Sequence, residues 1–374
     1  MPHSCFNIFV FFQGTMSTPN TSGAPRWKGI MKHRMIQGNF IAIVLISAFL
    51  LIFMFVKHKD IGRLLNNFPQ LPTAPPSPPP VRESVNLTDG VYTYHLDLSR
   101  FQSEFPYLQN YECSLNLTPR GQLEDKTGQP LLILAIKSHP SSGNRRGALR
   151  RTWAREGVVG GYGVRPIFLM GQGGTPGHME LVKVESREFG DILQWDINEG
   201  HHNLSLKERC FLEWLHHYVP WAAFIFKGDD DEYVNPAAVV QYITEHGSSP
   251  LTLHGNLWRY PSVMRSTKYR VSKTLYPFHR YPSFLSGGGF LFPGASVKIL
   301  YEASKTIPVF PLDDVYFGFL ALAGNLTYRH DARFHVHGLG YDACKYRQAL
   351  VVHGIGPERL VTVWNGVQEA QCKA

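Results

Sequence analysis

The sequence lacks the motifs that mark several large enzyme classes. It has no G-x-G-x-x-G after its first predicted strand and no G-x-x-x-x-G-K-[ST], so the dinucleotide-binding and P-loop classes lose their main support. It also has no G-x-S-x-G and no H-E-x-x-H, and therefore no sign of a serine nucleophile or a zinc peptidase. The formal net charge is +8, but Lys and Arg are scattered without a dense basic stripe, which argues against nucleic-acid binding.

One segment lacks charge altogether. Phe40–Val56 has no charged residue, and Ser47 is its only polar one. Its 17 residues lie at the short end of the range that spans a bilayer. A buried core helix of this length seldom lacks a polar face, and a cleaved signal peptide has a shorter apolar region followed by small residues. We therefore expect a single membrane anchor.

The flanks of this segment indicate how the chain is organised. Four basic residues precede it and three follow it, which favours a cytosolic N-terminus. Leu71–Val81 holds six prolines in eleven residues, as a semi-rigid polyproline spacer does. The predicted parts are a cytosolic tail (1–39), the transmembrane anchor (40–56), a Pro-rich lumenal stem (57–99) and a lumenal globular domain (100–374).

Cysteine is scarce, with five in the chain, four of which follow the apolar segment. An even number in an oxidising lumen predicts two disulfides with three possible pairings, of which Cys344–Cys372 is preferred; buried free thiols are the alternative. Four N-x-[ST] sequons in the same part of the chain are candidate glycosylation sites. The cysteines are Cys113, Cys210, Cys344 and Cys372, and the sequon asparagines are Asn86, Asn116, Asn203 and Asn325.

Apolar runs of strand length alternate with helical patterns in the globular part. Strands alternating with helices predict an α/β fold with a mainly parallel sheet, which binds its ligands at the carboxyl ends of the strands. The predicted strands are Leu131–Ser138, Pro166–Gly171, Asp191–Asp196 and Ala222–Lys227.

Capping signals predict where the helices begin and end. Ser205 and Glu208 have the spacing of a capping box. Asn235 is expected to cap a helix that starts at Pro236 and stops at Gly247. Two more helices are predicted, one from the acidic pair at 313–314 to residue 324 and a last one from residue 357.

Three consecutive carboxylates, Asp229 to Asp231, follow the fourth predicted strand directly. Like charges this close repel one another, and burying an anion without a partner is costly. A hard divalent cation, Mn²⁺ or Mg²⁺, would relieve the repulsion, hold phosphate oxygens and neutralise a leaving diphosphate. An acidic turn that caps the next helix is the alternative.

Three further features have a functional and a structural interpretation. At the start of a helix, Asp313 and Asp314 either complement the helix dipole or supply an ionised general base. The three glycines that begin at Gly287 either let backbone approach a ligand closely or form a plain turn. His353 ends the apolar run ALVVH, where an imidazole either completes a metal site or is a satisfied core histidine.

Six short stretches between about Leu131 and Cys372 carry a family resemblance. They are RRGALRRTWAREG from Arg145, DILQWD followed by NLSLKE, KGDDDEYVN, YPSFLSGGGF, PLDDVYFG from Pro311 and LVVHGI from Leu350. In this order they resemble the animal Golgi β1,3-glycosyltransferase family, and its N-acetylglucosaminyltransferase branch in particular. Many β1,3-galactosyltransferase relatives have Asp-Ser-Asp where this chain has Asp-Asp-Asp.

The resemblance implies a nucleotide-diphospho-sugar transferase fold of GT-A type, with a single Rossmann-like mixed sheet. It implies a single-pass type II protein of the Golgi membrane whose catalytic domain, residues 100–374, is lumenal. The implied reaction is inverting transfer of N-acetylglucosamine from UDP-GlcNAc to the 3-hydroxyl of a β-galactose on an O-glycan, N-glycan or poly-N-acetyllactosamine acceptor. The alternatives are a β1,3-galactosyltransferase that uses UDP-galactose and a non-catalytic lumenal partner subunit. A homo- or heterodimer with related transferases also fits the family.

The resemblance also implies roles for individual residues. Asp231 and His353 would ligate Mn²⁺ or Mg²⁺, and Asp314 would be the base, with Asp313 as its rival. Glu232-Tyr233 departs from the family's commoner pair of a small hydrophobic residue and Phe; we expect this to alter fine donor geometry without touching the metal. The residues expected around the donor are Arg146, Arg150, Asp229, Asp230, Gly287, Gly288 and Gly289, with a structural helix arginine as the alternative for Arg150.

Overall fold

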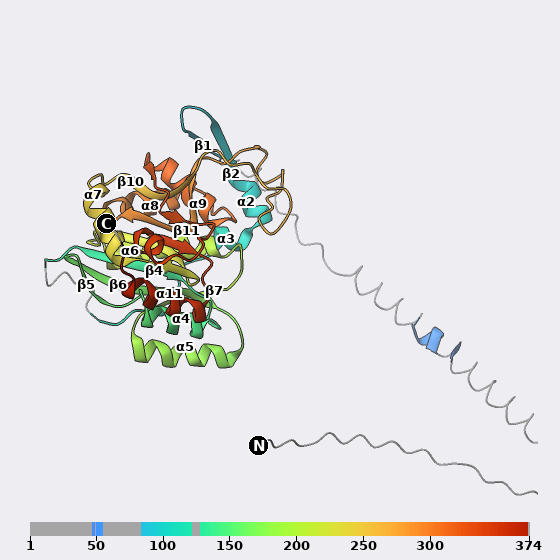
Figure 1. Ribbon diagram of the computed structural model, residues 1–374. Coiled ribbons are helices and arrows are strands. Elements are labelled where there is room, and N and C mark those ends of the chain that lie inside the picture. The colour runs from blue at the N-terminus through green and yellow to red at the C-terminus, as the bar shows by residue number, and fades with distance from the viewer. Residues whose placement is uncertain (1–46, 49, 55–83, 122–127, 373–374) are drawn as a thin grey trace, which may run out of the picture. The chain divides into compact units, whose positions relative to one another are not determined.

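The structure is a computed structural model and describes residues 47–48, 50–54, 84–121 and 128–372 (Figure 1). It divides after Pro80 into two units. In the N-terminal unit, residues 47–48 and 50–54 are helical. Across the described ranges, none of the helices combines the length and apolarity that crossing a membrane requires. The predicted tail, most of the predicted anchor and the stem up to residue 83 lie outside the described residues.

A nine-stranded mixed sheet forms the centre of the C-terminal unit, which confirms the α/β prediction. Its strands are β3 (Leu115–Leu117), β4 (Leu131–Lys137), β5 (Gly157–Val159), β6 (Tyr162–Gln172), β7 (Ile192–Asn198), β8 (Phe224–Asp229), β10 (Thr252–Trp258), β11 (Phe284–Pro293) and β12 (Thr327–His330). The order is β12-β10-β11-β8-β4-β6-β7-β3, with β5 paired to β6. The central strands β8, β4, β6 and β7 are parallel, while β3 and β11 run antiparallel to their neighbours β7 and β8.

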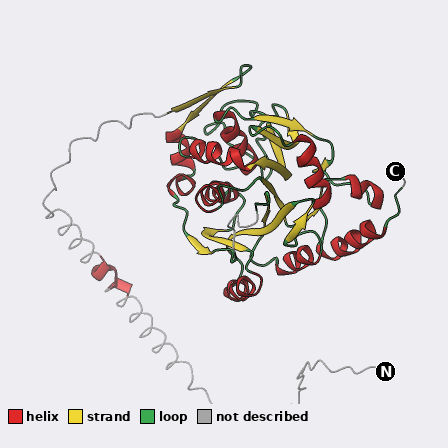
Figure 2. Ribbon diagram, turned by 90° about the vertical axis from the view of Figure 1, so that its left-hand side faces the viewer, coloured by secondary structure: helices red, strands yellow, loops and turns green. Residues whose placement is uncertain are grey.

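Helices cover both faces of the sheet (Figure 2). They are α2 (Leu98–Glu104), α3 (Pro106–Asn110), α4 (Gly143–Arg151), α5 (Pro176–Phe189), α6 (Leu204–Tyr218), α7 (Pro236–His246), α8 (Val297–Ser304), α9 (Asp313–Ala323), α10 (Ala343–Gln348) and α11 (Pro357–Glu369). Along β4 successive side chains point to opposite faces. Ile133 and Ala135 join the core formed with α6, α8 and α9, whereas Leu132, Leu134 and Ile136 join the core formed with α4, α5, α7 and α11. A strand buried on both faces explains the continuous apolar run.

Two small sheets complete the C-terminal unit. A hairpin of β1 (Ser84–Thr88) and β2 (Thr93–Asp97) falls within the predicted stem, yet Tyr94 and Leu96 of β2 belong to the core. In the second sheet, β14 (Val351–His353) pairs with both β13 (Phe334–His335) and β9 (Glu232–Val234). This second sheet positions the candidate site because β9 follows the three carboxylates and β14 ends at His353.

Most helix predictions are confirmed, and one is wrong. The side chain of Asn235 accepts a hydrogen bond from the N–H of Ala238 at the start of α7, and α9 and α11 begin as predicted. The Ser205–Glu208 capping box does not form. Helix α6 already begins at Leu204, and the buried Glu208 carboxylate contacts the ammonium of Lys227 on β8. An ion pair in the core therefore replaces the predicted cap.

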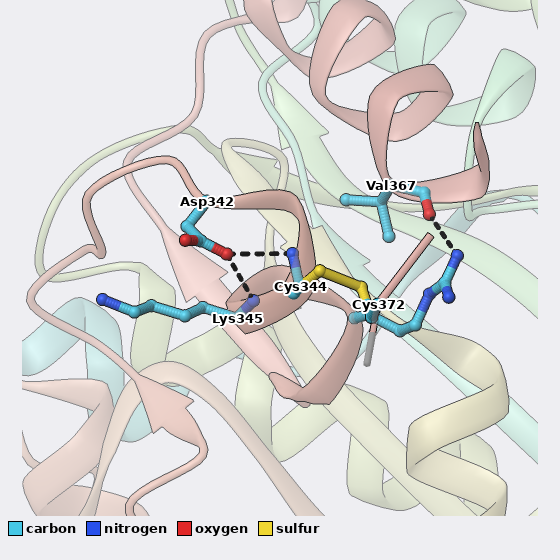
Figure 3. Close-up of a disulfide and its surroundings, with 6 residues drawn as sticks. Asp342, Cys344, Lys345, Val367 and Cys372 are labelled. Atoms are coloured by element: carbon cyan, nitrogen blue, oxygen red, sulfur yellow. Dashed lines mark hydrogen bonds between the residues drawn. A yellow bond between two sulfur atoms is a disulfide. The ribbon is translucent and has the colours of Figure 1, made fainter. Parts of the chain in front are cut away.

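Two disulfides are present among the described residues. The preferred pair, Cys344–Cys372, is confirmed and joins α10 to the segment after α11 (Figure 3). Next to it, the side chain of Asp342 accepts hydrogen bonds from the N–H groups of Cys344 and Lys345 and so caps α10. The second disulfide, Cys113–Cys210, ties the segment before β3 to α6. The alternative of buried free thiols is wrong for all four cysteines.

Candidate active site

The three carboxylates form a turn that leads from β8 into β9. The backbone carbonyl of Asp231 accepts hydrogen bonds from the N–H groups of Gly354 and Ile355, at 2.9 and 2.7 Å. These bonds extend the pairing of β9 with β14 and bring His353 beside the turn. Nε2 of His353 lies 3.5 Å from Oδ1 of Asp231. The two residues predicted to hold a metal are therefore neighbours in space, although they lie far apart in the sequence.

An open pocket of about 380 Å³ lies over this turn. Its walls are the residues after β4, the first turns of α4 and α6, the carboxylate turn and His353. Asp229, Asp230 and Asp231 all line it, so the predicted carboxylates share one cavity. The pocket lies at the carboxyl ends of the parallel strands β4 and β8, where α/β proteins bind ligands.

Two cations hold the carboxylates in place. Nζ of the buried Lys137, the last residue of β4, lies 3.1 Å from Oδ1 of Asp229 and 2.9 Å from Oδ2 of Asp313. The guanidinium of Arg145 lies 3.5 Å from Asp230 and 3.8 Å from Asp231. Lys137 thus links the carboxylate turn to the second acidic pair. No pattern in the sequence indicates this link.

The second acidic pair lies at the start of α9, with different partners for its two members. Asp313 takes the ammonium of Lys137, whereas Oδ2 of Asp314 accepts a hydrogen bond of 3.0 Å from the N–H of Gly287. Burial alone would raise the pKa of Asp313, but the charge of Lys137 outweighs it and holds this pKa far below its usual range. Burial and the charge of Asp313 raise the pKa of Asp314 to about 7. At the start of this helix, burial and a like charge therefore oppose the dipole, which by itself favours the ionised form of Asp314.

The glycine run connects the two halves of the site. A Cβ added at Gly287 would overlap the carboxylate of Asp314, and one added at Gly288 would lie 3.4 Å from the ring of His353. Gly289 has a φ of 103°, which disfavours any side chain. The glycine backbone therefore comes close to Asp314 and to His353.

The two arginines predicted near the donor do not line the pocket. Arg146 is only 1% exposed, and its guanidinium binds Glu185, Ser138 and the backbone of two other residues. Arg150 pairs with Glu185 and Asp191. Arg150 thus has the partners that its structural alternative expects, and protein groups already take all five N–H donors of Arg146, which was expected near the donor. Arg146 acts on the site indirectly.

That indirect path runs through one hydroxyl group. The guanidinium of Arg146 donates to Oγ of Ser138, and Oγ of Ser138 donates to Oδ2 of Asp230 over 2.7 Å. Burial raises the pKa of Asp230, against the Ser138 hydrogen bond and the charge of Arg145. Sequence reasoning missed Lys137, Ser138 and Arg145. Lys137 and Ser138 could have been found as site residues, because they end the first predicted strand and α/β proteins bind ligands at strand ends.

A divalent cation fits the side chains present. Ligand atoms of Asp229, Glu232 and His353 lie within 4.8 Å of one another, and Asp231 adjoins His353. Carboxylate oxygens with one imidazole suit Mn²⁺, and the oxygens suit Mg²⁺. Glu232, which is expected from the sequence to lie away from the metal, directly opposes His353 where β9 pairs with β14.

The sequon asparagines lie outside the pocket. Asn86, Asn116 and Asn325 are exposed. Asn203 is partly buried, its side chain donates to the carbonyl of Asn198, and the hydroxyl residue of its sequon, Ser205, is fully buried. Glycosylation at any of the four remains a prediction, and the structure favours the three exposed ones.

Comparisons with known proteins show which family this chain belongs to. The family described as "Galactosyltransferase" matches residues 144–332. Human acetylgalactosaminyl-O-glycosyl-glycoprotein beta-1,3-N-acetylglucosaminyltransferase is 37% identical over 255 residues, which cover 63% of this chain and 66% of that protein. Human N-acetyllactosaminide beta-1,3-N-acetylglucosaminyltransferase 4 is 34% identical over 302 residues, 78% of each chain. Beta-1,3-galactosyltransferase 5 of Pan paniscus is 31% identical over 244 residues, 64% of this chain and 81% of that protein. This chain is therefore a glycosyltransferase and belongs to the galactosyltransferase family.

Proposed function

We propose that this glycosyltransferase moves N-acetylglucosamine from UDP-GlcNAc to the 3-hydroxyl of a β-galactose on a glycan, with inversion at the anomeric carbon. One observation carries the proposal. Lys137 contacts Asp229 of the carboxylate turn and Asp313 beside Asp314, so the end that suits a diphosphate adjoins the end that suits a general base. The names of the first two relatives supply the choice of sugar.

The reaction is a single displacement. Asp314 takes the proton of the acceptor 3-hydroxyl, and the freed oxygen attacks the anomeric carbon of the donor. The bond from that carbon to the β-phosphate oxygen breaks, and its electron pair leaves with UDP. The hydrogen bond from Gly287 fixes the direction in which Asp314 accepts the proton. Attack from the face opposite UDP turns an α-linked donor into a β1,3 product.

The carboxylate turn binds the leaving group. We propose that Asp231 and His353 hold Mn²⁺ or Mg²⁺ with support from Asp229, and that Arg145 contacts the donor diphosphate. A bound divalent cation supplies positive charge that offsets the charge developing on the diphosphate. The same roles imply a fold of GT-A type, which we propose together with the function.

The site also fits a second donor. UDP-galactose has the same diphosphate and would use the same carboxylates and base, and one relative carries the name beta-1,3-galactosyltransferase 5. The triple aspartate favours UDP-GlcNAc on the resemblance described above. The choice of acceptor glycan belongs to loops around the pocket.

The test uses the purified full-length chain with a β-galactoside and, in separate reactions, UDP-GlcNAc, UDP-Gal and UDP-GalNAc, each with Mn²⁺ or with EDTA. We expect product from UDP-GlcNAc that disappears with EDTA and in Asp231→Ala. Product from UDP-Gal alone would identify a galactosyltransferase with the same mechanism. No product from any donor by a chain with a cooperative melting transition would overturn the proposal and favour a non-catalytic partner subunit.

We further propose that the enzyme works in the Golgi lumen behind a type II anchor. Disulfides persist in oxidising compartments, and the C-terminal unit has two. Protection of the C-terminal unit from protease in sealed Golgi vesicles is the expected result. Digestion of that unit in intact vesicles would place it on the cytosolic side and contradict the proposal.

A further inference from the structure

We propose that Glu232 is an additional ligand for the divalent cation and reaches it from the buried side of the site. The inference rests on the proposed function only in requiring that the carboxylate turn binds a cation. It assigns a role to Glu232, the first of the two residues after the aspartates at which this chain departs from the family pattern. The cation would then have a carboxylate on its protein side that never faces solvent.

The first observation is that this buried carboxylate has no side-chain partner among the described residues. Glu232 is 0% exposed, and neither of its oxygens accepts a hydrogen bond from the described residues. The backbone N–H of Asp229 favours the charged form, but it lies outside good hydrogen-bond geometry, and no side chain of the described residues donates to either oxygen. A buried carboxylate without a partner is costly, and most buried polar groups are paired. The unpaired oxygens therefore indicate a ligand.

The second observation is the direction of the side chain. Glu232 and His353 are directly opposite each other in the antiparallel pair of β9 and β14, so both side chains lie on the same face. One carboxylate oxygen of Glu232 and ligand atoms of Asp229 and His353 lie within 4.8 Å of one another. The three groups are therefore close enough to share one ion.

The third observation is that the backbone provides the space. A Cβ added at Gly228 would overlap the carboxylate of Glu232, so the glycine before the aspartates leaves room for it. The carbonyl of Glu232 accepts a hydrogen bond of 2.8 Å from the indole of Trp153, which holds the residue in position. The carboxylate is thus fixed next to the turn and not displaced into the core.

Two other buried carboxylates show what a structural role looks like in this fold. Glu208 contacts the ammonium of Lys227, and Glu185 binds the guanidinium groups of Arg146 and Arg150. No comparable cation contacts Glu232 among the described residues, because Lys137 is engaged by Asp229 and Asp313. Glu208 therefore serves as a matched control.

The experiment measures Mn²⁺ binding to the full-length chain without donor or acceptor. Free Mn²⁺ is counted by electron paramagnetic resonance, and melting temperatures are taken in EDTA and in Mn²⁺ for wild type, Glu232→Gln and Glu208→Gln. For Glu232→Gln we expect a melting temperature in EDTA at or above that of wild type, and a Mn²⁺ dissociation constant raised tenfold or more. Glu208→Gln should melt lower in EDTA and bind Mn²⁺ as wild type does.

A structural role for Glu232 gives the opposite pattern. A Glu232→Gln chain that melts lower in EDTA and binds Mn²⁺ within twofold of wild type would overturn the inference. If the Gln variant does not fold, Glu232→Val gives the same comparison with an apolar side chain. If wild type transfers sugar and Glu232→Gln binds Mn²⁺ as wild type does, the inference about Glu232 is refuted and the proposed function stands. Mn²⁺ binding that needs Glu232, without sugar transfer, refutes the proposed function alone.

Discussion

The backbone N–H of Gly287 donates a hydrogen bond of 3.0 Å to the carboxylate of Asp314. Residue 287 can make this bond because it has no side chain. A Cβ there would overlap the same carboxylate. A strand residue thus sets the position of a helix residue that we propose as the catalytic base. The first prediction follows from this contact.

Replacing Gly287 with Ala should disable the base while leaving the fold and the cation site in place. The added methyl group pushes the Asp314 carboxylate out of line, and a displacement of about 1 Å costs on the order of 10²-fold in rate. The measurement is kcat for sugar transfer, together with the Mn²⁺ dissociation constant, which should not change.

The matched control is Gly340→Ala. Nothing lies within 4 Å of a Cβ added at Gly340, which has no left-handed conformation. Its kcat should equal that of wild type. If kcat of the Gly287→Ala chain equals that of wild type, then catalysis does not depend on the position in which Gly287 holds the Asp314 carboxylate.

The rate of transfer should depend on pH through Asp314. Burial and the charge of Asp313 raise the pKa of Asp314 to about 7, and only the ionised form accepts a proton. The kcat/KM should therefore rise with pH and level off above about pH 7. Asp314→Asn should lose activity by about 10²-fold or more. A flat profile between about pH 5 and pH 9 in wild type would exclude Asp314 as the base.

The same pKa has a consequence for stability. The folded-state pKa of Asp314 lies above the ordinary value, so the folded chain binds more protons than the unfolded chain between about pH 4 and pH 7. The contribution of Asp314 to stability is therefore lost as pH rises through that window. At about pH 8, in EDTA, Asp314→Asn should melt at a higher temperature than wild type. A lower melting temperature would show that the charged form is stabilised by the fold.

Two neighbouring arginines should behave differently on substitution. Arg146→Ala removes a guanidinium that is 1% exposed and leaves Glu185 short of a partner, so we expect a loss of about 3 to 5 kcal/mol in the free energy of unfolding. The side chain of Arg145 is 34% exposed and lines the pocket. Arg145→Ala should leave the melting temperature nearly unchanged and raise KM for the sugar nucleotide about tenfold. Chemical unfolding and donor titration distinguish the two, and the reverse pattern would reject this assignment.

The two disulfides should contribute unequally to stability. Cys113–Cys210 closes a separation of 97 residues and Cys344–Cys372 one of 28. Chain entropy predicts losses of about 5 and about 4 kcal/mol when each pair is replaced by Ala. Urea unfolding of the two double variants measures the difference. A larger loss for the shorter loop would mean that native packing around α10, and not chain entropy, decides.

Patterns local in the sequence predicted much of the fold. The cap at Asn235 and the apolar run of β4 depend on neighbouring residues, and both occur where the pattern predicts them. The capping box at Ser205 failed because the partner of Glu208 lies on β8. The local sequence around Glu208 does not show that Lys227 will lie opposite it in the core.

The arginines of α4 illustrate the same limit within the site. Adjacent residues on a helix point about 100° apart, so either Arg145 or Arg146 could face the pocket until the orientation of α4 is known. Packing of α4 on the sheet buries Arg146 and leaves Arg145 at the pocket. The pairing of Asp231 with His353 came from family resemblance, because no local pattern connects residues so far apart in the chain.

The pairing of β9 with β14 also bears on how the chain is made. The turn at Asp231 receives its two hydrogen bonds from Gly354 and Ile355, which leave the ribosome more than a hundred residues later. At ordinary rates of translation this interval lasts roughly ten seconds, during which the aspartates lack the strand that closes their turn. A chain that ends before Val351 keeps every aspartate of the site but has neither His353 nor that strand. The proposed cation site therefore has all of its parts only after Ile355 has been synthesised.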